Sequence, residues 1–338
     1  MTTNANDIAD ITTFTDVHHK QLKQITPQHQ TTPTHDTITR TFAILDPQYL
    51  QTFQTQFNKL LNTNQGEKIK KIPHIDGKTQ KSNTNNTQTP NHIVNIVDKH
   101  SFFLTQKLVN DKSNEIATIP QLLDSLNIKG HTLTRDATGT QKEIVAKIRQ
   151  KQANYALALK ANQKTLYTDV NPCFADPVFL ATKTLYFKTT QKAKGNIELW
   201  EYWQSKDISR LSTQDNWMNL RTIVMTKNTV TKPDGTVSEQ TRYFISSLSL
   251  NVKEIARVIR GYWMVESAHW HLDVTFEEDA NCTLDRMAAF SLNILRKLVL
   301  NFLKMLDLSE FKGSVSLKTR RFITSCDPIK YLQQFLTL

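Results

Sequence analysis

The chain has 338 residues, 38% of them hydrophobic, and carries a net charge of +11 with a sequence pI near 9.4. That length can hold one large domain or two ordinary ones, and the excess of Lys and Arg favours a polyanionic partner, nucleic acid before an anionic membrane. No apolar run approaches the roughly 18 residues of a membrane span, and the first residues lack the pattern of a signal peptide. Three widely spaced cysteines are typical of reduced thiols, so we expect a cytoplasmic protein.

The first part of the chain changes from polar to helical. Residues 1–32 are rich in Thr, Gln and His and predict a poorly structured lead-in. From residue 33, apolar residues recur every three or four positions, and Asp46-Pro47 divides this run in two. The spacing predicts a small helical region over 33–64.

Residues 65–165 predict alternating strands and helices. We expect a strand leading to Asp76, strands over 92–97 and 101–109, a helix from Ser113 or Asn114, a strand over 131–136 that ends in Asp136, a helix over 141–152 and a strand over 155–160. The first three strands can form an antiparallel meander, and the helices are long enough to be crossovers to parallel strands. This order is typical of an RNase H-like core with a mixed five-stranded sheet and flanking helices, in which Asp76 and Asp136 end different strands.

The surroundings of Asp76 allow two interpretations. An Asp-Gly pair such as Asp76-Gly77 is most often a turn, whereas a carboxylate at the end of a central strand can be a metal ligand if others join it. Five lysines lie nearby, and they are typical either of a solvated loop or of phosphate contacts: Lys68, Lys70, Lys71, Lys78 and Lys81.

Residues 166–250 predict a mostly β insertion. Strands are expected over 184–190, 197–203, 220–226 and 241–247, with a hairpin turn over 232–235. The aromatic residues Trp200, Trp203 and Trp217 fit the core of this insertion better than a platform for stacked bases.

Residues 251–306 return to a helical period. Ile255, Ile259, Tyr262, Glu266 and His269 fall on one stripe. Glu266 is therefore expected on the face that carries apolar residues, where a carboxylate needs a partner. That partner is either a metal or a basic side chain (Arg257, Arg260 or a His). An acidic cluster that includes Glu278 follows, and residues 307–338 form a C-terminal tail.

Three carboxylates stand out from this survey: Asp76, Asp136 and Glu266, with Glu278 as the alternative third acid. Carboxylates that converge from several elements suit a pair of Mg²⁺ or Mn²⁺ ions, which can promote attack on a phosphodiester and stabilise the leaving oxygen. The sequence contains neither a Gly-rich nucleotide loop nor paired cysteines at zinc spacing.

Seven runs resemble the DDE transposases of insertion sequences, specifically the H-repeat-associated family. They are Ile75-Asp76-Gly77-Lys78-Thr79, Lys112-Ser113-Asn114-Glu115-Ile116, Asp136-Ala137-Thr138-Gly139-Thr140-Gln141, Leu157-Ala158-Leu159-Lys160-Ala161-Asn162-Gln163, Arg242-Tyr243-Phe244-Ile245-Ser246-Ser247-Leu248, Ile259-Arg260-Gly261-Tyr262-Trp263-Met264-Val265-Glu266-Ser267 and Leu272-Asp273-Val274-Thr275-Phe276-Glu277-Glu278-Asp279. The resemblance covers about residues 33 to 304. Arg135 departs from it, because an apolar strand residue is usual there.

The resemblance implies an enzyme that cleaves and transfers DNA strands with the acids Asp76, Asp136 and Glu266. Its partners would be the terminal inverted repeats of an element and target DNA, bound by a homodimer associated with the nucleoid. The expected DNA contacts are Lys78, Lys81, Lys160, Asn162, Arg260 and Tyr262. Two alternatives stay open: a catalytically decayed DNA-binding remnant, and a general RNase H-like nuclease.

Overall fold

The computed structural model describes residues 1–27, 31–64, 72–81, 89–109, 115–136, 139–193, 195–311 and 313–336. Three of the lysines near Asp76 (Lys68, Lys70 and Lys71) lie outside these ranges, as do Lys112, Ser113 and Asn114, the first three residues of one of the seven runs. The chain packs as two compact units. The first comprises Met1–Lys68, Gly77–Lys112 and Val265–Leu338, and the second comprises Ile69–Asp76 and Ser113–Met264.

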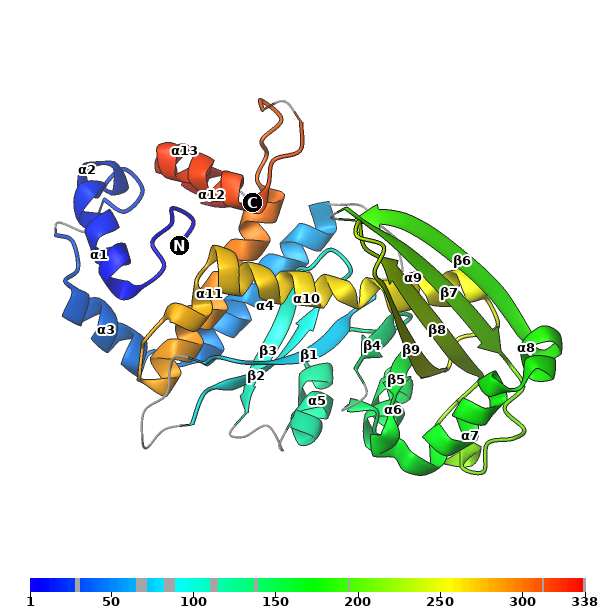
Figure 1. The fold of residues 1–338 in the computed structure, drawn as a ribbon. Coiled ribbons are helices and arrows are strands. Elements are labelled where there is room, and N and C mark those ends of the chain that lie inside the picture. The colour runs from blue at the N-terminus through cyan, green and yellow to red at the C-terminus, as the bar shows by residue number, and fades with distance from the viewer. Residues whose placement is uncertain are drawn as a thin grey trace. The chain divides into compact units, whose positions relative to one another are not determined.

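The first unit is mainly helical (Figure 1). Its elements are α1 (Ile8–Val17), α2 (His19–Leu22), α3 (His35–Ile44), α4 (Pro47–Asn64), β2 (His92–Val97), β3 (Phe103–Val109), most of α10 (Trp263–Trp270), the π-helical turn η5 (His271–Thr275), the short η6 (Glu278–Ala280), α11 (Arg286–Met305), α12 (Leu317–Cys326) and α13 (Pro328–Leu336). The helices α3 and α4 confirm the split of the helical pattern at Asp46-Pro47. α11 is buried along most of its length and forms the centre of this unit with α4 and β3.

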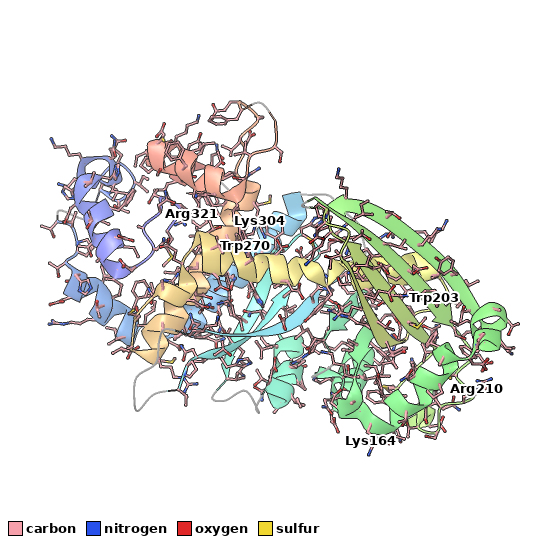
Figure 2. All side chains as sticks on the ribbon, viewed as in Figure 1. Lys164, Trp203, Arg210, Trp270, Lys304 and Arg321 are labelled. Atoms are coloured by element: carbon pink, nitrogen blue, oxygen red, sulfur yellow. The ribbon has the colours of Figure 1, made fainter. Side chains whose placement is uncertain are left out.

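The N-terminal segment differs from the poorly structured lead-in expected from its composition. Asp7 caps α1 by accepting a hydrogen bond from the backbone N–H of Asp10. Arg321 of α12 donates to the carbonyl oxygen of Met1 and to Oδ1 of Asn6, and thereby ties this segment to the C-terminal helices (Figure 2). Polar composition misled the prediction because long-range hydrogen bonds, together with the buried side chains of Ala5 and Ile8, hold the segment.

The second unit carries most of the strands. Its elements are α5 (Glu115–Asp124), β4 (Thr132–Arg135), α6 (Lys142–Gln150), β5 (Asn154–Leu159), η3 (Ala161–Gln163), α7 (Lys164–Ala175), α8 (Pro177–Lys183), β6 (Thr184–Ala193), β7 (Asn196–Ser205), η4 (Gln214–Asn216), β8 (Thr222–Thr231), β9 (Val237–Ser246) and α9 (Val252–Gly261). β1 (His74–Thr79) begins in this unit and continues into the first. The parallel pairs β1–β4 and β4–β5 confirm the crossover connections predicted for the core.

The strands of the described residues form a sheet of nine, in the order β3-β2-β1-β4-β5-β9-β8-β7-β6, and not the five expected. The four strands of the β-rich region were predicted close to their positions, and they lie in the chain between β5 and α9, as expected of an insertion. The sequence did not indicate that they extend the sheet of the core: β9 pairs antiparallel with β5, from Ala156 opposite Ser246 to Leu159 opposite Tyr243. Pairing partners far apart in sequence leave no local trace, so this extension could not be read from the pattern.

The apolar face of α9 covers one face of the second unit's sheet. Its side chains pack with Trp200, Tyr202 and Phe244 in one cluster. Trp200 and Trp217 are almost fully buried, as the core interpretation predicted, whereas Trp203 is only partly buried. In the part of the chain that the structure describes, no helix is both long enough and apolar enough to cross a membrane.

Candidate active site

Two of the predicted acids occupy equivalent places on neighbouring parallel strands. In the register of β1 with β4, His74 lies opposite Thr134 and Ile75 lies opposite Arg135. The next residue along each chain is a carboxylate, Asp76 and Asp136. His74 and Thr134 are joined by a side-chain hydrogen bond, and residues two apart on a strand share a face. The fold therefore sets both carboxylates side by side on one face of the sheet.

The pair Asp76-Gly77 is not a turn, and Asp76 does not end its strand. β1 continues through Gly77 and Lys78 to Thr79, so Asp76 is its third residue. The turn interpretation is therefore wrong. The inter-strand hydrogen bonds of a central strand outweigh the local preference of the dipeptide for a turn.

His74 is a site residue that the sequence analysis missed. It is completely buried, and burial lowers the pKa of its imidazole to about 3, so the ring is neutral. The ring of Tyr262 meets it edge-on, with centroids 6.2 Å apart. A Cβ on Gly261 would lie 3.0 Å from Cε1 of His74. The C-terminal end of α9 therefore lies against the face from which Asp76 and Asp136 project, and the only signal in the sequence was the place of His74 two residues before Asp76.

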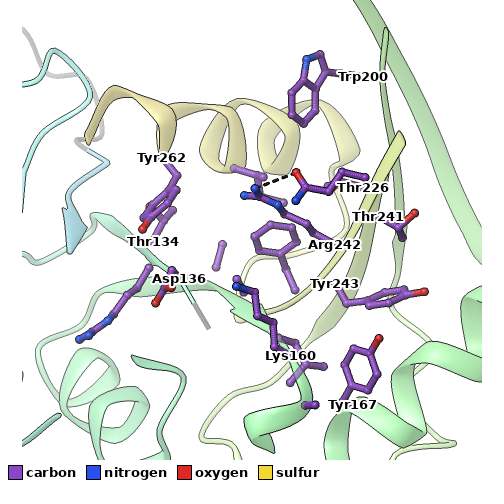
Figure 3. Close-up of a pocket in the computed structure, with 18 residues that line it drawn as sticks. Thr134, Asp136, Lys160, Tyr167, Trp200, Thr226, Thr241, Arg242, Tyr243 and Tyr262 are labelled. Carbon is purple, nitrogen blue, oxygen red and sulfur yellow. Dashed lines mark hydrogen bonds between the residues drawn. The ribbon is translucent and has the colours of Figure 1, made fainter. Parts of the chain in front are cut away.

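A cavity of about 320 Å³ opens beside Asp136, entirely within the second unit. Its lining includes the predicted DNA contacts Lys160 and Tyr262, together with Arg242, Tyr167 and Tyr243, which the sequence analysis did not select. In Figure 3, Lys160 and Arg242 point into one space, with Asp136 and Tyr262 on one side of it and Tyr167 and Tyr243 on the other. The cavity thus joins a candidate catalytic carboxylate to cationic and aromatic side chains.

Arg135, the unusual residue before Asp136, forms an ion pair with a carboxylate other than Asp136. Its Nη2 lies 2.9 Å from Oε1 of Glu115 on α5, and both side chains are almost fully buried. Its side chain also occupies the place where a Cβ on Gly139 would stand. The charge beside Asp136 is therefore balanced by Glu115. Ala137 and Thr138 lie outside the described residues.

Glu266 has a different environment from the one predicted. It is exposed on α10, whereas Val265, Ala268 and Leu272 carry the apolar face. The expectation that Glu266 lies on the buried stripe is wrong. The stripe continued the period of α9, but Tyr262 separates α9 from α10 and the buried face shifts there.

The alternative acid, Glu278, lies in a buried ionic cluster of the first unit. Lys78 Nζ is 3.0 Å from Oε2 of Glu278, 2.6 Å from Oδ1 of Asp273 and 3.2 Å from Oδ1 of Asp279. Burial alone would lower the pKa of Lys78, but Glu278 and Asp273 outweigh that effect and raise it above its ordinary value. Burial would likewise raise the pKa of Glu278, but Lys78, Lys297 and Arg296 hold it below its ordinary value. Glu278 is thus ionised, enclosed and matched by cations.

The remaining predicted DNA contacts lie in varied surroundings. Lys78 is buried in this ionic cluster, an environment that argues against a contact with DNA. Lys81 is 81% exposed, with its Nζ 3.5 Å from Oδ2 of Asp279. Asn162 is exposed on η3. The guanidinium of Arg260 lies 4.6 Å from the centre of the Trp200 ring and Nη2 is 3.6 Å from Oε2 of Glu198.

The donors present fit divalent cations, because Asp76 and Asp136 supply hard oxygen ligands from adjacent strands. Over the described ranges, three or more His, Cys, Asp or Glu side chains do not gather closely enough to form a metal site by themselves. The two strands thus provide a carboxylate pair to which further ligands can be added.

Comparisons with known proteins agree with this arrangement. The model of the Transposase DDE domain family matches residues 38–302. A protein of Escherichia coli O157:H7 named "Putative transposase YncI" is 31% identical over 297 residues, which are 86% of this chain and 75% of that protein. A protein of E. coli K12 named "H repeat-associated putative transposase YhhI" is 28% identical over 330 residues, which are 92% of this chain and 83% of that protein. The chain belongs to the DDE transposase family, and its core has the RNase H-like fold of that family.

Proposed function

We propose that this protein catalyses metal-dependent cleavage and transfer of DNA strands during transposition of an insertion sequence. The observation that carries the proposal is the register of β1 with β4, which sets Asp76 and Asp136 side by side on one face of the sheet. Membership of the DDE transposase family supports DNA as the substrate. The element's terminal inverted repeats and a target DNA would be the partners, bound by a homodimer at the nucleoid.

Asp76, Asp136 and Glu266 are the residues that would hold two Mg²⁺ or Mn²⁺ ions. Bound there, the ions would activate the attacking water (in cleavage) or 3′-hydroxyl (in strand transfer) and would stabilise the charge on the leaving 3′ oxygen. We favour Glu266 over Glu278 as the third acid because Glu266 is exposed, whereas Glu278 has no exposed side-chain surface and is matched by Lys78. Withdrawing Glu278 from that cluster would leave Lys78 with fewer buried partners, which is costly.

The protein's own groups would position the DNA around these acids. Lys160 and Tyr262 reach the cavity that Asp136 lines, so they can contact the backbone next to the reacting phosphodiester. Exposed Lys81 and Asn162 are suited to contacts further along the DNA. His74, neutral and buried, would keep the two strands in register through its bond to Thr134.

The test is cleavage and joining of terminal DNA from the protein's own element with Mg²⁺ or Mn²⁺. Asp76→Asn and Asp136→Asn should abolish both cleavage and joining. Glu266→Gln should also abolish both reactions. Glu278→Gln, provided that the variant is folded, should leave both reactions intact. Asp215→Asn is the matched control, because Asp215 is an exposed carboxylate of the same unit. Wild-type rates in both Asp variants would refute the proposal.

The same assay separates the other two interpretations. Salt-dependent duplex binding without any metal-dependent cleavage would identify a DNA-binding remnant. Cleavage of unrelated DNA or RNA without joining would identify a general nuclease.

A further inference from the structure

The cavity of the second unit brings together two cations from distant parts of the sequence. Lys160 directly follows β5, and Arg242 belongs to β9, the strand through which the β-rich region joins the core. Leu159 of β5 pairs with Tyr243 of β9, so Lys160 and Arg242 are the next residues along the two antiparallel strands. Both line the cavity and point into it (Figure 3).

These cations stand on the face of the sheet that carries the candidate catalytic acids. Ala158 pairs with Phe244, and Ala156 pairs with Thr134, which lies two residues before Asp136. Because side chains two apart share a face, the row that contains Asp136 continues through Ala158 to Phe244. Lys160 and Arg242 form the next row along the strands. A group held by them would therefore lie beside whatever Asp136 acts upon.

The chemistry of the lining suits an anion with an apolar attachment. Of the described residues that line the cavity, three are cationic and one, Asp136, is a carboxylate. Arg135 pairs with Glu115, and Lys160 and Arg242 are the other two cations among these lining residues. Tyr262 and Thr226 also line the cavity, and its apolar lining includes Ala156, Ala158, Phe244 and Ile259. A backbone phosphate with its deoxyribose meets both requirements.

Arg242 has a hydrogen-bond partner on its own strand. Its Nη2 donates to Oε1 of Gln240 at 2.9 Å, and both residues lie on β9 (dashed line in Figure 3). A planar guanidinium can bind two phosphate oxygens at once, which a lysine ammonium cannot do.

We propose that Arg242 and Lys160 together bind one DNA backbone phosphate next to the phosphodiester that reacts. This inference rests on the proposed function, and it assigns the β-rich region a direct part in holding the substrate. The two residues have different roles in this site: Arg242 fixes the orientation of the phosphate, and Lys160 supplies a second positive charge.

The first experiment measures binding of the full-length protein to a short duplex of the element's terminal DNA in EDTA, where no cleavage occurs. Arg242→Gln should weaken binding about tenfold and reduce the dependence of log K on log[salt] by about 0.9, the loss of one phosphate contact. Lys160→Gln should do the same, and Arg242→Lys should restore the salt dependence but only part of the affinity. Lys188→Gln is the control, because Lys188 is exposed and lies next to Phe187 on the strand, so it faces away from α9.

The second experiment identifies the phosphate. A series of duplexes, each with one neutral methylphosphonate linkage, is bound to wild type and to Arg242→Gln. One linkage should weaken binding by the wild type and leave binding by the variant unchanged, because the variant has already lost that contact. If no linkage behaves in this way, or if Arg242→Gln keeps the full salt dependence, the inference is wrong. Circular dichroism and thermal unfolding establish that each variant is folded.

Failure here is distinguishable from failure of the proposed function. Wild-type protein that cleaves terminal DNA with Mg²⁺ while no linkage is coupled to Arg242 would leave the function standing and remove the phosphate site. A coupled linkage in a wild-type protein that never cleaves would establish the phosphate site and remove the function.

Discussion

The ammonium group of Lys78 lies 3.0 Å from Oε2 of Glu278, a carboxylate with no exposed side-chain surface. Asp273 and Asp279 form ion pairs with the same ammonium group, so Lys78 pairs with three carboxylates of the first unit. Lys78 follows Asp76 by two residues on β1, and the three acids follow α10, the helix of Glu266. This ionic cluster therefore ties β1 to the segment that follows α10.

Loss of Lys78 is expected to destabilise the first unit more than loss of any one of its partners. Lys78→Met should lower the free energy of unfolding by about 3–5 kcal/mol, because it leaves buried carboxylates without a cation. Glu278→Gln should cost less, since Asp273 and Asp279 still hold the ammonium. Calorimetry is the suitable measurement because it resolves units that unfold separately.

Lys81→Met provides the control for this comparison. Lys81 pairs with Asp279 from an 81% exposed position, so its loss should change stability little. An equal effect of Lys78→Met and Lys81→Met would contradict a structural role for the buried cluster.

His269 should make the first unit sensitive to acid. Burial, aided by Lys297 and Lys78, lowers the pKa of its imidazole to about 3 from an ordinary value of 6.5. Between these values the unfolded chain binds a proton that the folded protein does not. Stability is therefore expected to fall as the pH drops from 6.5 toward 3, and to be unaffected by this group above 6.5.

His269→Phe isolates that contribution, since it keeps a ring beside Phe103 but removes the titration. Urea unfolding at pH 7 and at pH 4.5 gives the stability difference for each protein. We expect a smaller difference in the variant than in the wild type. Identical differences would show that His269 is not held neutral.

Gly139→Ala is expected to break the buried ion pair between Glu115 and Arg135, the residue directly before Asp136. The added Cβ would overlap the Arg135 side chain, which is enclosed and paired with Glu115 and cannot move away freely. The cost should be about 3 kcal/mol of stability. In a background with Arg135→Leu and Glu115→Leu, the same change should cost much less, because the obstructing guanidinium is gone. Thermal unfolding of the four proteins completes the cycle, and equal costs in both backgrounds would refute the explanation.

Arg260 should contribute to packing more than to DNA binding. Its guanidinium stacks on Trp200 and approaches Glu198, so Arg260→Gln is expected to cost about 1 kcal/mol of stability. The salt dependence of duplex binding should stay as in the wild type. A decrease of about 0.9 in that slope would instead support the DNA contact predicted from the sequence.

Local pattern accounts for much of what could be predicted. Strands around Asp136 and Lys160, the helices between them and the four strands of the β-rich region all have a clear period of apolar residues in the sequence. The ordered run of motifs also indicated the family, and with it the pair Asp76 and Asp136. These features depend on residues near each other in the chain, and their spacing is therefore visible without a structure.

Pairings between distant residues decided the rest. The sequence made Asp76-Gly77 a candidate turn, and only the central position of β1 in the sheet showed that the strand continues. It placed Glu266 on a buried stripe, and only the break at Tyr262 exposed that carboxylate. Three further features join residues that lie from 20 to about 200 positions apart in the sequence. They are the ion pairs of Lys78, the ion pair of Arg135 with Glu115, and the shared cavity of Lys160 and Arg242. The energy of a buried charge depends on which charges surround it, and that environment exists only once the chain has folded.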